Sequence, residues 1–351
     1  MQQIQAWGAP AAGKPLAPMS IERREPGPHD VVIEILYCGV CHSDIHQARD
    51  EWSGAIFPMV PGHEIVGRVA SVGSEISKFE VGDRAGVGCL VDSCRSCAPC
   101  ADGLEQFCAK GPALTYNGTE MDRKTLTYGG YSTQIVVDER YALRIPARLD
   151  AAAAAPLLCA GITTYSPLRQ WGCKPGDRVG VVGLGGLGHM AVKLAASMGA
   201  KVTVLSTSEA KAADARRLGA SDFVVTKGRA FEQLARTLDL IVDTVSAPHD
   251  YNAYLGLLRP RGVMAIVGAP ATATALHPFS LILGGTRLAG SMIGGIAETQ
   301  EMLDHCAQHG IVSDIELIPI QKINQAYERV LKSDVRYRFV IDIASLRTPA
   351  A

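Results

Sequence analysis

The sequence lacks the features that would direct it to nucleic acid, to a lipid surface or out of the cell. Basic and acidic residues nearly cancel, 34 against 35, so no overall positive charge attracts phosphate backbones or anionic lipid. No apolar run reaches the ~20 residues of a membrane-spanning helix, and Pro156 and Pro270 interrupt the longest ones. The first residues have no basic patch leading into an apolar stretch, as a secretory signal has. We therefore expect a cytoplasmic protein with no nucleic acid or membrane partner.

Aromatic residues are also few, at 6%, but the rest of the composition is that of a globular protein. Hydrophobic residues make up 47% and charged residues 20%, which excludes a disordered or collagen-like chain. A single core rarely grows beyond about 250 residues, so a chain of 351 residues predicts roughly two domains. The ten cysteines would stay reduced in the cytosol, which favours thiols or metal ligands over disulfides.

Hydrophobic patterning differs between the two halves of the chain. Up to about residue 150, short Val- and Ile-rich runs such as Val31–Leu36 are interrupted by glycine and proline and predict mostly β structure. After Ala151, strand-length runs alternate with alanine-rich helical ones, as in βαβ units and a doubly wound parallel sheet. The predicted strands are 178–182, 202–205, 223–225, 240–242, 262–267 and 287–292, with helices at 189–198 and 210–218. Beyond residue 295 we predict helices 299–309 and 323–332 and strands 316–320 and 338–341, which the pattern assigns to neither domain.

Four cysteines form a C-x2-C-x2-C-x7-C pattern: Cys94, Cys97, Cys100 and Cys108. Gaps of two residues let one tight loop point successive sulfurs at a tetrahedral zinc ion. Four thiolates leave no open coordination position, so this zinc would be structural. Metal-free loop cysteines and an iron–sulfur cluster are the alternatives, although the ferredoxin ending C-x3-C-P is absent.

A second set of metal ligands is spread over three segments. Cys41 and His63 are weak signals on their own, because a single buried cysteine or histidine is more often packing than ligand. Cys159 lies where the β-rich half meets the βαβ half and completes a Cys2His set. Such a set with an open fourth position is a known catalytic zinc arrangement.

A glycine-rich turn follows the apolar strand before residue 183. It comprises Gly183, Leu184, Gly185, Gly186, Leu187 and Gly188, and it opens a helix, which is the context of a dinucleotide-binding turn. An acid about 20 residues further on would accept the ribose 2′-hydroxyl of NAD. Here that segment holds three hydroxyl side chains and a cation instead, which favours the 2′-phosphate of NADPH: Ser206, Thr207, Ser208 and Lys211.

Together these motifs resemble the zinc-dependent medium-chain alcohol dehydrogenases, and within them the cinnamyl alcohol dehydrogenase-like branch. The resemblance covers nearly the whole chain and is carried by segments 38–46, 61–64, 94–108, 159–163 and 183–188. It implies an α/β fold in which a β-rich GroES-like catalytic domain spans 1–157 and 295–351. A doubly wound parallel (Rossmann) domain that binds NADP would span 158–294.

The resemblance also implies roles for individual residues. Cys41, His63 and Cys159 would hold the catalytic zinc, with Glu64 as a fourth ligand when substrate is absent. Asp44 would orient the ligating imidazole. Ser43 and His46 would relay the proton through a cofactor ribose hydroxyl, with a surface histidine as the alternative interpretation of His46.

Two larger sets follow from the same resemblance. Further cofactor-lining residues would be Thr163, Thr244, Gly268, Ser291, Met292 and Ile293. In the cleft between the domains, apolar walls of the substrate pocket would be Trp52, Phe57, Cys89, Leu114 and Ala269. Leu114 stands where plant lignin-pathway members commonly have tryptophan, which suits a broader aldehyde range than cinnamyl alcohols.

The implied protein is a zinc- and NADP-dependent alcohol dehydrogenase with two zinc ions per chain. It would reduce aromatic or medium-chain aliphatic aldehydes to primary alcohols with hydride from NADPH. A polyol or sugar-alcohol dehydrogenase, a non-catalytic NADPH-binding protein and a zinc-free quinone reductase are the alternatives. We expect a homodimer, formed through the edge strand near Arg287–Met292.

Overall fold

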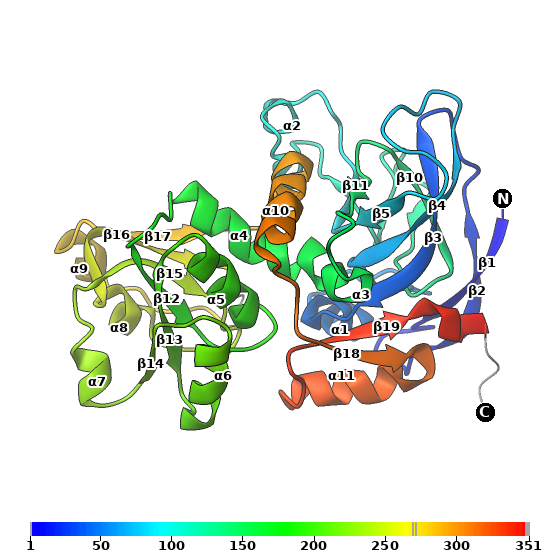
Figure 1. The fold of residues 1–351 in the computed structure, drawn as a ribbon. Helices are drawn as coiled ribbons and strands as arrows, with labels where there is room; N and C mark the ends of the chain where they lie inside the picture. The colour runs from blue at the N-terminus through cyan, green and yellow to red at the C-terminus, as the bar shows by residue number, and fades with distance from the viewer. Residues whose placement is uncertain (1, 269, 271, 348–351) are drawn as a thin grey trace. The chain divides into compact units, whose positions relative to one another are not determined.

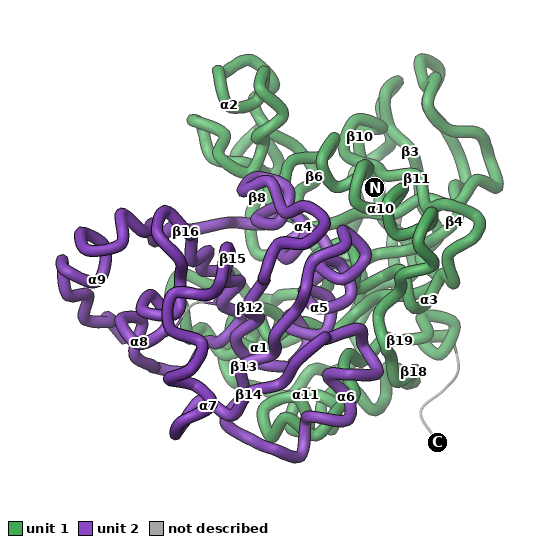
Figure 2. The backbone as a smooth tube through the Cα atoms, turned by 60° about the vertical axis from the view of Figure 1, so that its left-hand side comes forward, with its two compact units in different colours: residues 1–159, 294–351 green, residues 160–293 purple. Residues whose placement is uncertain are grey.

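The computed structural model describes residues 2–268, 270 and 272–347, and the chain divides into two compact units. Unit 1 comprises the described parts of 1–159 and 294–351, and unit 2 comprises those of 160–293 (Figure 2). The chain therefore leaves unit 1 once and returns to it. Ala269, a predicted pocket residue, lies outside the described residues.

Unit 1 is built around a seven-stranded sheet with the order β11-β5-β4-β3-β19-β18, in which β10 also pairs with β3 (Figure 1). Its strands are β3 (Asp30–Gly39), β4 (Ile65–Val72), β5 (Arg84–Val87), β10 (Gln134–Asp138), β11 (Leu143–Arg144), β18 (Ile315–Pro319) and β19 (Arg338–Asp342). The C-terminal strand β19 runs antiparallel to β3, with Ile341 opposite Cys38. This pairing joins the end of the chain to its β-rich beginning, a question that the sequence pattern left open.

Small ribbons and short helices complete unit 1. Its other strands are β1 (Gln2–Gly8), β2 (Ala17–Arg23), β6 (Leu90–Asp92), β7 (Ala113–Leu114), β8 (Gly118–Thr119) and β9 (Leu126–Thr127). Its α-helices are α1 (His42–Ala48), α2 (Ala98–Ala101), α3 (Ala151–Ala154), α10 (Ile296–His309) and α11 (Ile323–Leu331). Its 3-10 helices are η1 (Glu105–Phe107), η2 (Ala155–Leu158), η4 (Ile320–Lys322) and η5 (Ile343–Arg347).

Unit 2 is a parallel six-stranded sheet with the order β14-β13-β12-β15-β16-β17. Its strands are β12 (Arg178–Val182), β13 (Lys201–Ser206), β14 (Asp222–Val225), β15 (Leu238–Asp243), β16 (Leu258–Ile266) and β17 (Arg287–Gly290). Its helices are α4 (Ala160–Gln170), α5 (Gly188–Ser197), η3 (Glu209–Lys211), α6 (Ala212–Arg217), α7 (Arg229–Glu232), α8 (Tyr251–Leu255) and α9 (Phe279–Ile282). The strand order reverses at β12, which is where doubly wound sheets bind ligands.

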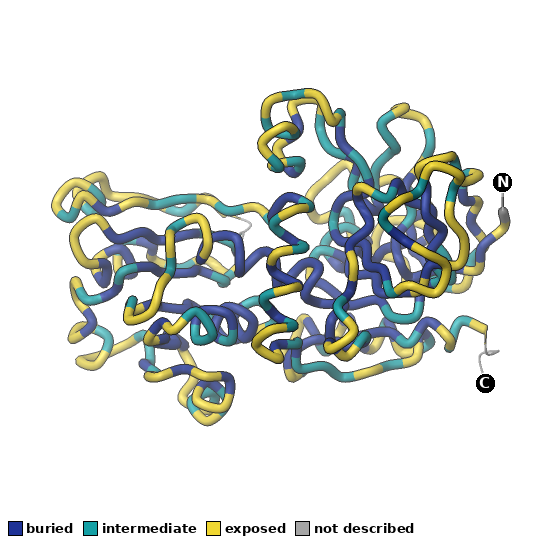
Figure 3. Tube along the Cα trace, turned by 45° about the horizontal axis from the view of Figure 1, so that its top comes forward, coloured by how far each residue is buried: buried dark blue, intermediate teal, exposed yellow. Residues whose placement is uncertain are grey.

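The predicted α/β fold is confirmed, and so is the number of strands in the parallel sheet. All six predicted strands of unit 2 form, and most bounds agree within two residues, although β16 begins four residues earlier than expected. The predicted helix over 210–218 appears as η3 followed by α6. Strands inside the sheets, such as β3 and β12, are largely buried, whereas the edge strands β17 and β18 are not; Figure 3 colours the chain by this burial.

Among the described residues, no single helix is long and apolar enough to cross a membrane. The neighbouring helices at Ala151–Leu158 and Ala160–Gln170 pass that test of length and composition only when taken together, across a bend.

Candidate functional site

Unit 1 gathers two groups of metal-binding side chains. In the first group, one potential ligand atom from each of Cys41, His63, Glu64 and Cys159 lies within 4.8 Å of the others, and all four residues are buried. The second group consists of Cys94, Cys97, Cys100 and Cys108, whose sulfur atoms also lie within 4.8 Å of one another. The structure thus brings together both ligand sets that the sequence singled out.

The first group is assembled around the buried side chain of Asp44. Cys41 caps the N-terminus of α1, and its backbone N–H donates to Asp44 Oδ2 at 2.8 Å. The Nδ1 atom of His63 lies 3.3 Å from Asp44 Oδ1, so its Nε2 is free to face a ligand. Tyr131 donates its hydroxyl to Asp44 Oδ2 at 3.1 Å. Asp44 therefore fixes the position of the His63 imidazole relative to the start of α1.

Glu64 is enclosed on two sides. One oxygen contacts the guanidinium of Arg338, which is also buried, and the other, Oε2, has no hydrogen-bond partner among the described residues. A side chain at Gly39 would collide with this carboxylate, since a Cβ there would lie 1.9 Å from Oε2. Burial raises the pKa of Glu64 to about 7, although the charge of Arg338 opposes this shift. The unpartnered oxygen is the one available to a cation.

The donor set of this group fits a zinc ion. A tetrahedral zinc with sulfur ligands at ~2.3 Å and nitrogen at ~2.0 Å places its ligand atoms about 3 to 4 Å apart, within the spread seen here. The hydrogen bond with Cys159 lowers the pKa of the Cys41 thiol well below its ordinary value, against the effect of burial. Two thiolates and a neutral imidazole would cancel the charge of Zn²⁺ and leave a mild Lewis acid.

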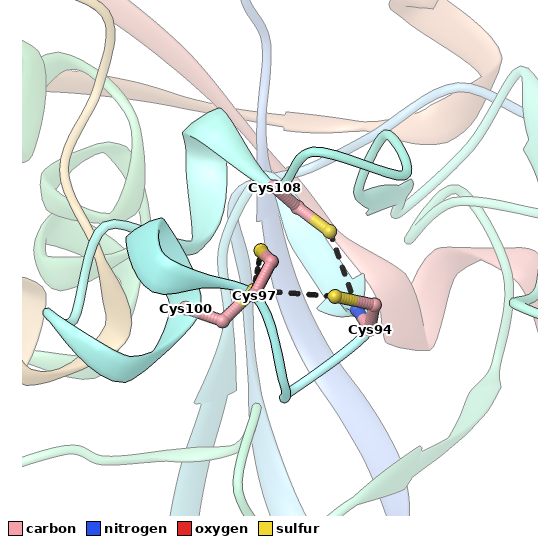
Figure 4. A group of neighbouring side chains, drawn as sticks. All are labelled: Cys94, Cys97, Cys100 and Cys108. Carbon is pink, nitrogen blue, oxygen red and sulfur yellow. Dashed lines mark hydrogen bonds between the residues drawn. The ribbon is translucent and has the colours of Figure 1, made fainter.

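The four-cysteine group occupies a loop around α2 (Figure 4). The sulfur of Cys100 lies 3.4 Å from that of Cys97 and 4.0 Å from that of Cys94, close to the ~3.8 Å edge of a ZnS4 tetrahedron. Backbone N–H groups donate to two of the sulfurs, from Cys94 to Cys108 at 3.3 Å and from Ala109 to Cys97 at 3.4 Å. A hydrogen bond from the backbone of Ser96 contributes most to lowering the pKa of Cys94 to about 5. The four thiols fit a structural zinc ion.

The glycine-rich turn of unit 2 connects β12 to α5. Gly183 has φ +85°, and a Cβ at Gly188 would lie 2.2 Å from the carbonyl oxygen of Gly183. By contrast, a Cβ at Gly185 would meet nothing within 4 Å. Two glycines are therefore required by the turn, whereas the third keeps the backbone open to an incoming phosphate.

Most of the predicted cofactor residues of unit 2 lie at the carboxyl edge of its sheet. Parallel strands end at one edge, and the residues concerned end or follow β12, β13, β15, β16 and β17: Gly183, Ser206, Thr244, Gly268 and Ser291. Lys211 reaches back to this edge and donates from Nζ to the carbonyl of Leu184 at 2.9 Å. Met292 and Ile293 follow Ser291, while Thr163 is buried in α4.

The end of β13 carries no acid. Ser206 is buried, and its hydroxyl oxygen accepts from the backbone N–H of Ser208 at 3.3 Å. This turn holds the hydroxyl-rich segment in place beside Lys211, which begins α6 as its N-cap. Hydroxyls and an ammonium suit a phosphate dianion better than a neutral ribose hydroxyl.

The other predicted residues of unit 1 lie either beside the first metal group or in the loop that follows α1. Ser43 lies beside the first metal group, with its hydroxyl oxygen 3.6 Å from the sulfur of Cys41. Cys89 borders the same group, and its hydrogen bond with Cys159 lowers the pKa of the Cys89 thiol. Leu114 of β7 lies opposite Leu90 of β6, the residue after Cys89. Trp52 is 51% exposed and stacks on the ring of His46 at 4.8 Å, and Phe57 is half-buried in the same loop.

Sequence reasoning missed three residues that contact the first group or the Asp44 side chain behind it. They are Arg338 against Glu64, Tyr131 against Asp44, and Tyr116, whose ring stacks on His63 with 5.7 Å between centroids. No sequence motif links any of the three to its partner, because each lies in a segment far from that partner along the chain. Cys38, Cys173 and Cys306 lie outside both metal groups of the described residues.

Comparison with known proteins agrees with this arrangement. A family model for the alcohol dehydrogenase GroES-like domain matches residues 27–147, and one for zinc-binding dehydrogenases matches residues 186–308. Aldehyde reductase YahK of Escherichia coli is 57% identical over 348 residues, covering 98% of this chain and 99% of that protein. NADP-dependent alcohol dehydrogenase C 1 of Mycolicibacterium smegmatis is 56% identical over 350 residues, covering 99% of this chain and 100% of that protein. A cinnamyl alcohol dehydrogenase structure from Sorghum bicolor superposes with a TM-score of 0.95 at 47% identity, covering 98% of both chains.

Proposed function

The chain belongs to the zinc-dependent medium-chain alcohol dehydrogenases of the cinnamyl alcohol dehydrogenase-like branch, and we propose that it reduces aromatic or medium-chain aliphatic aldehydes to primary alcohols with NADPH. NADP-dependent alcohol dehydrogenase or aldehyde reductase activity follows from its relatives. The observation that carries the proposal is the buried group of Cys41, His63 and Cys159, with Asp44 behind the imidazole.

The catalytic roles follow from the chemistry of that group. When bound, zinc would polarise the carbonyl of an aldehyde, and NADPH would supply the hydride. Cys41, His63 and Cys159 would hold the ion, and Glu64 would offer its unpartnered oxygen as an alternative ligand. Asp44 would fix the tautomer of His63 so that Nε2 faces the metal.

A proton must also reach the substrate oxygen when an aldehyde becomes an alcohol. The Ser43 hydroxyl lies beside the metal group and would deliver that proton. His46 lies three residues further along α1, is partly exposed, and would restore the proton from water. The two residues would act as a relay out of a buried site.

In unit 2, Ser206, Thr207, Ser208 and Lys211 would bind the 2′-phosphate of NADPH. The N-terminus of α5, behind Gly185, would take the pyrophosphate. In unit 1, the second zinc would sit among the four cysteines around α2, a helix with no buried residues of its own. We therefore propose two zinc ions per chain.

A homodimer and a cytoplasmic location complete the proposal. The edge strand β17 and the exposed apolar side chains of α9 and the residue after it, Phe279, Ile282 and Leu283, would suit a second copy of this chain. Among the described residues no cysteine forms a disulfide, which suits a reducing compartment.

An assay of metal content and turnover tests the proposal. The purified protein should contain two zinc ions per chain and should reduce benzaldehyde faster with NADPH than with NADH. Faster turnover of a sugar alcohol than of benzyl alcohol would favour the polyol alternative. No turnover of either with zinc and NADPH bound would favour a binding protein, and less than one zinc per chain would favour a quinone reductase.

A further inference from the structure

Unit 1 has a groove of about 620 Å³ at the β11 end of its main sheet, and none of its lining residues belongs to either metal group. Its walls come from β4, the loop between β4 and β5, β5 itself, and β11 with the residues that follow it. These three strands are neighbours in the sheet (Figure 1). The volume lies within the ~300–1,000 Å³ of sites for small organic ligands. The groove is therefore large enough for more than a single ion.

Four of the lining side chains are cations: Arg68, Lys78, Arg84 and Arg144. Among the described residues, none of the four forms an ion pair with a carboxylate. Their hydrogen bonds go to backbone carbonyl oxygens, from Arg68 at 3.0 Å, from Arg84 at 3.1 Å and from Lys78 at 2.6 Å. Arg144 donates from Nε to the carbonyl of Lys78 at 3.2 Å. These neutral partners orient the side chains without cancelling their charge.

The sheet register places two of these charges against each other. Arg68 of β4 and Arg84 of β5 are directly opposite partners in an antiparallel pair. Like charges at such positions repel and destabilise the sheet. Arg144 of β11 lies opposite Ala85, the residue after Arg84, and adds a third arginine on the neighbouring strand. An anion bound between these strands would remove the repulsion.

The acidic residues nearby do not neutralise the groove. Glu80 and Asp83 also line it, so four cations and two carboxylates leave a net charge of +2. Asp83 already accepts a hydrogen bond from the backbone N–H of Glu80 at 2.9 Å. Burial and the charge of Arg144 lower the pKa of Lys78, and the carboxylate of Glu139 opposes this shift only in part. The cations therefore act on one another more strongly than any carboxylate acts on them.

Guanidinium groups recognise phosphate well, because their planar fork of N–H donors matches two phosphate oxygens. We propose that this groove binds a small organic anion with two phosphate groups, of the chemical class of the sugar bisphosphates. One phosphate would lie between Arg68 and Arg84, and the other would face Lys78 and Arg144. The inference goes beyond the proposed function, since the groove contains none of the residues assigned to zinc, NADPH or the aldehyde.

Calorimetric titration with fructose 1,6-bisphosphate tests the site. The zinc-loaded protein should carry one equivalent of NADPH, so that the phosphate-binding residues of unit 2 are already occupied. We expect one saturable site per chain, with a Kd that rises with ionic strength because salt screens the charges. The absence of saturable binding at millimolar concentrations would overturn the inference.

Substitutions assign the binding to the groove. R68M should weaken the bisphosphate about 10-fold, the value of one charge-assisted hydrogen bond. R84K keeps the charge but loses the fork, so its affinity should fall between those of the wild type and R68M. R123M is the matched control, because Arg123 is an exposed arginine of unit 1 outside the groove that also donates to a backbone carbonyl, at 2.9 Å. Wild-type affinity in R68M, or an equal loss in R123M, would overturn the inference.

Thermal unfolding separates binding from a structural role. R68M removes one of two opposed positive charges, so its Tm without the anion should not fall below that of the wild type. The bisphosphate should raise the Tm of the wild type more than that of R68M, because a ligand stabilises the folded state that binds it. A lower Tm of R68M without the anion, together with equal increases on adding it, would assign Arg68 to structure alone and overturn the inference.

A titration with citrate distinguishes phosphate from carboxylate groups as the source of the charge. Citrate carries several carboxylates and no phosphate, and it should bind more weakly than the bisphosphate. Citrate binding as tight as that of the bisphosphate would overturn the phosphate class.

Discussion

The guanidinium of Arg338 contacts the carboxylate of Glu64, although the two residues lie 274 positions apart in the chain. Both side chains are buried, Arg338 at the start of β19 and Glu64 just before β4. Burial opposes the charge of Arg338, but the attraction of Glu64 raises the pKa of Arg338 above its ordinary value. The C-terminal segment is therefore linked to the candidate metal site by this ion pair as well as by the pairing of β19 with β3.

Removing one partner of this pair should lower the free energy of unfolding more than removing both partners. R338M leaves Glu64 buried without its counter-charge, and we expect a loss of about 3 kcal/mol in the free energy of unfolding. The double variant E64M/R338M should recover at least half of that loss. Denaturant unfolding of the zinc-loaded proteins measures both values.

A surface arginine supplies the control for this comparison of the single and double variants. Arg329 forms exposed ion pairs with Glu316 and Asp334, and R329M should cost less than about 1 kcal/mol. Equal losses in R338M and R329M, or a double variant less stable than R338M, would contradict a buried, coupled pair.

The pH dependence of unit 2 should reflect His249. Its Nε2 lies 3.0 Å from Asp243, and this hydrogen bond raises the pKa of His249 despite partial burial. A raised folded-state pKa contributes stability that is complete below the unfolded value of about 6.5 and is lost as pH rises through the folded value. The stability difference between wild type and H249Q should thus be larger at pH 6 than at pH 8.5, by less than about 1 kcal/mol because the ring is partly exposed.

Denaturant unfolding at those two pH values checks this expectation. H277Q is the control, since His277 is an exposed histidine of the same unit that stacks on Phe279. Its unfolding free energy should follow that of the wild type at both pH values. A difference between wild type and H249Q that grows toward pH 8.5 would have the wrong sign.

How much the sequence could predict depended on whether a feature was local. The six strands of unit 2 were predictable because each is a continuous apolar run bounded by turn residues, as Arg178–Val182 is. The two-residue cysteine spacings marked the group at 94–108 for the same reason. The hydrophobic pattern alone assigned the segment after residue 295 to neither domain, because its place depends on the pairing of β19 with β3 across the chain. Only the family resemblance implied that it belongs to the catalytic domain. The contact of Arg338 with Glu64 is likewise a property of the folded sheet.

Cofactor preference should respond to one substitution at the end of β13. S206D places a carboxylate where the 2′-phosphate of NADPH is proposed to bind and where NAD would offer a ribose hydroxyl. We expect kcat/KM with NADPH to fall at least 10-fold relative to kcat/KM with NADH. S221D adds the same charge at an exposed position of unit 2 and should leave that ratio unchanged. An unchanged preference in S206D would contradict the phosphate assignment of this segment.

The two metal groups should separate into one needed for turnover and one needed for stability. C159A removes a ligand from a buried group whose surroundings, including Asp44, are held by their own hydrogen bonds. It should abolish turnover and lower the zinc content from two to one per chain, with an unchanged fold by circular dichroism. C100S removes a ligand from a loop whose helix has no buried residues, so it should also lose one zinc but unfold at lower temperature. C173S, outside both groups, should keep two zinc ions and full activity. A C159A variant that still turns over aldehyde at the wild-type rate would exclude this group from the chemistry.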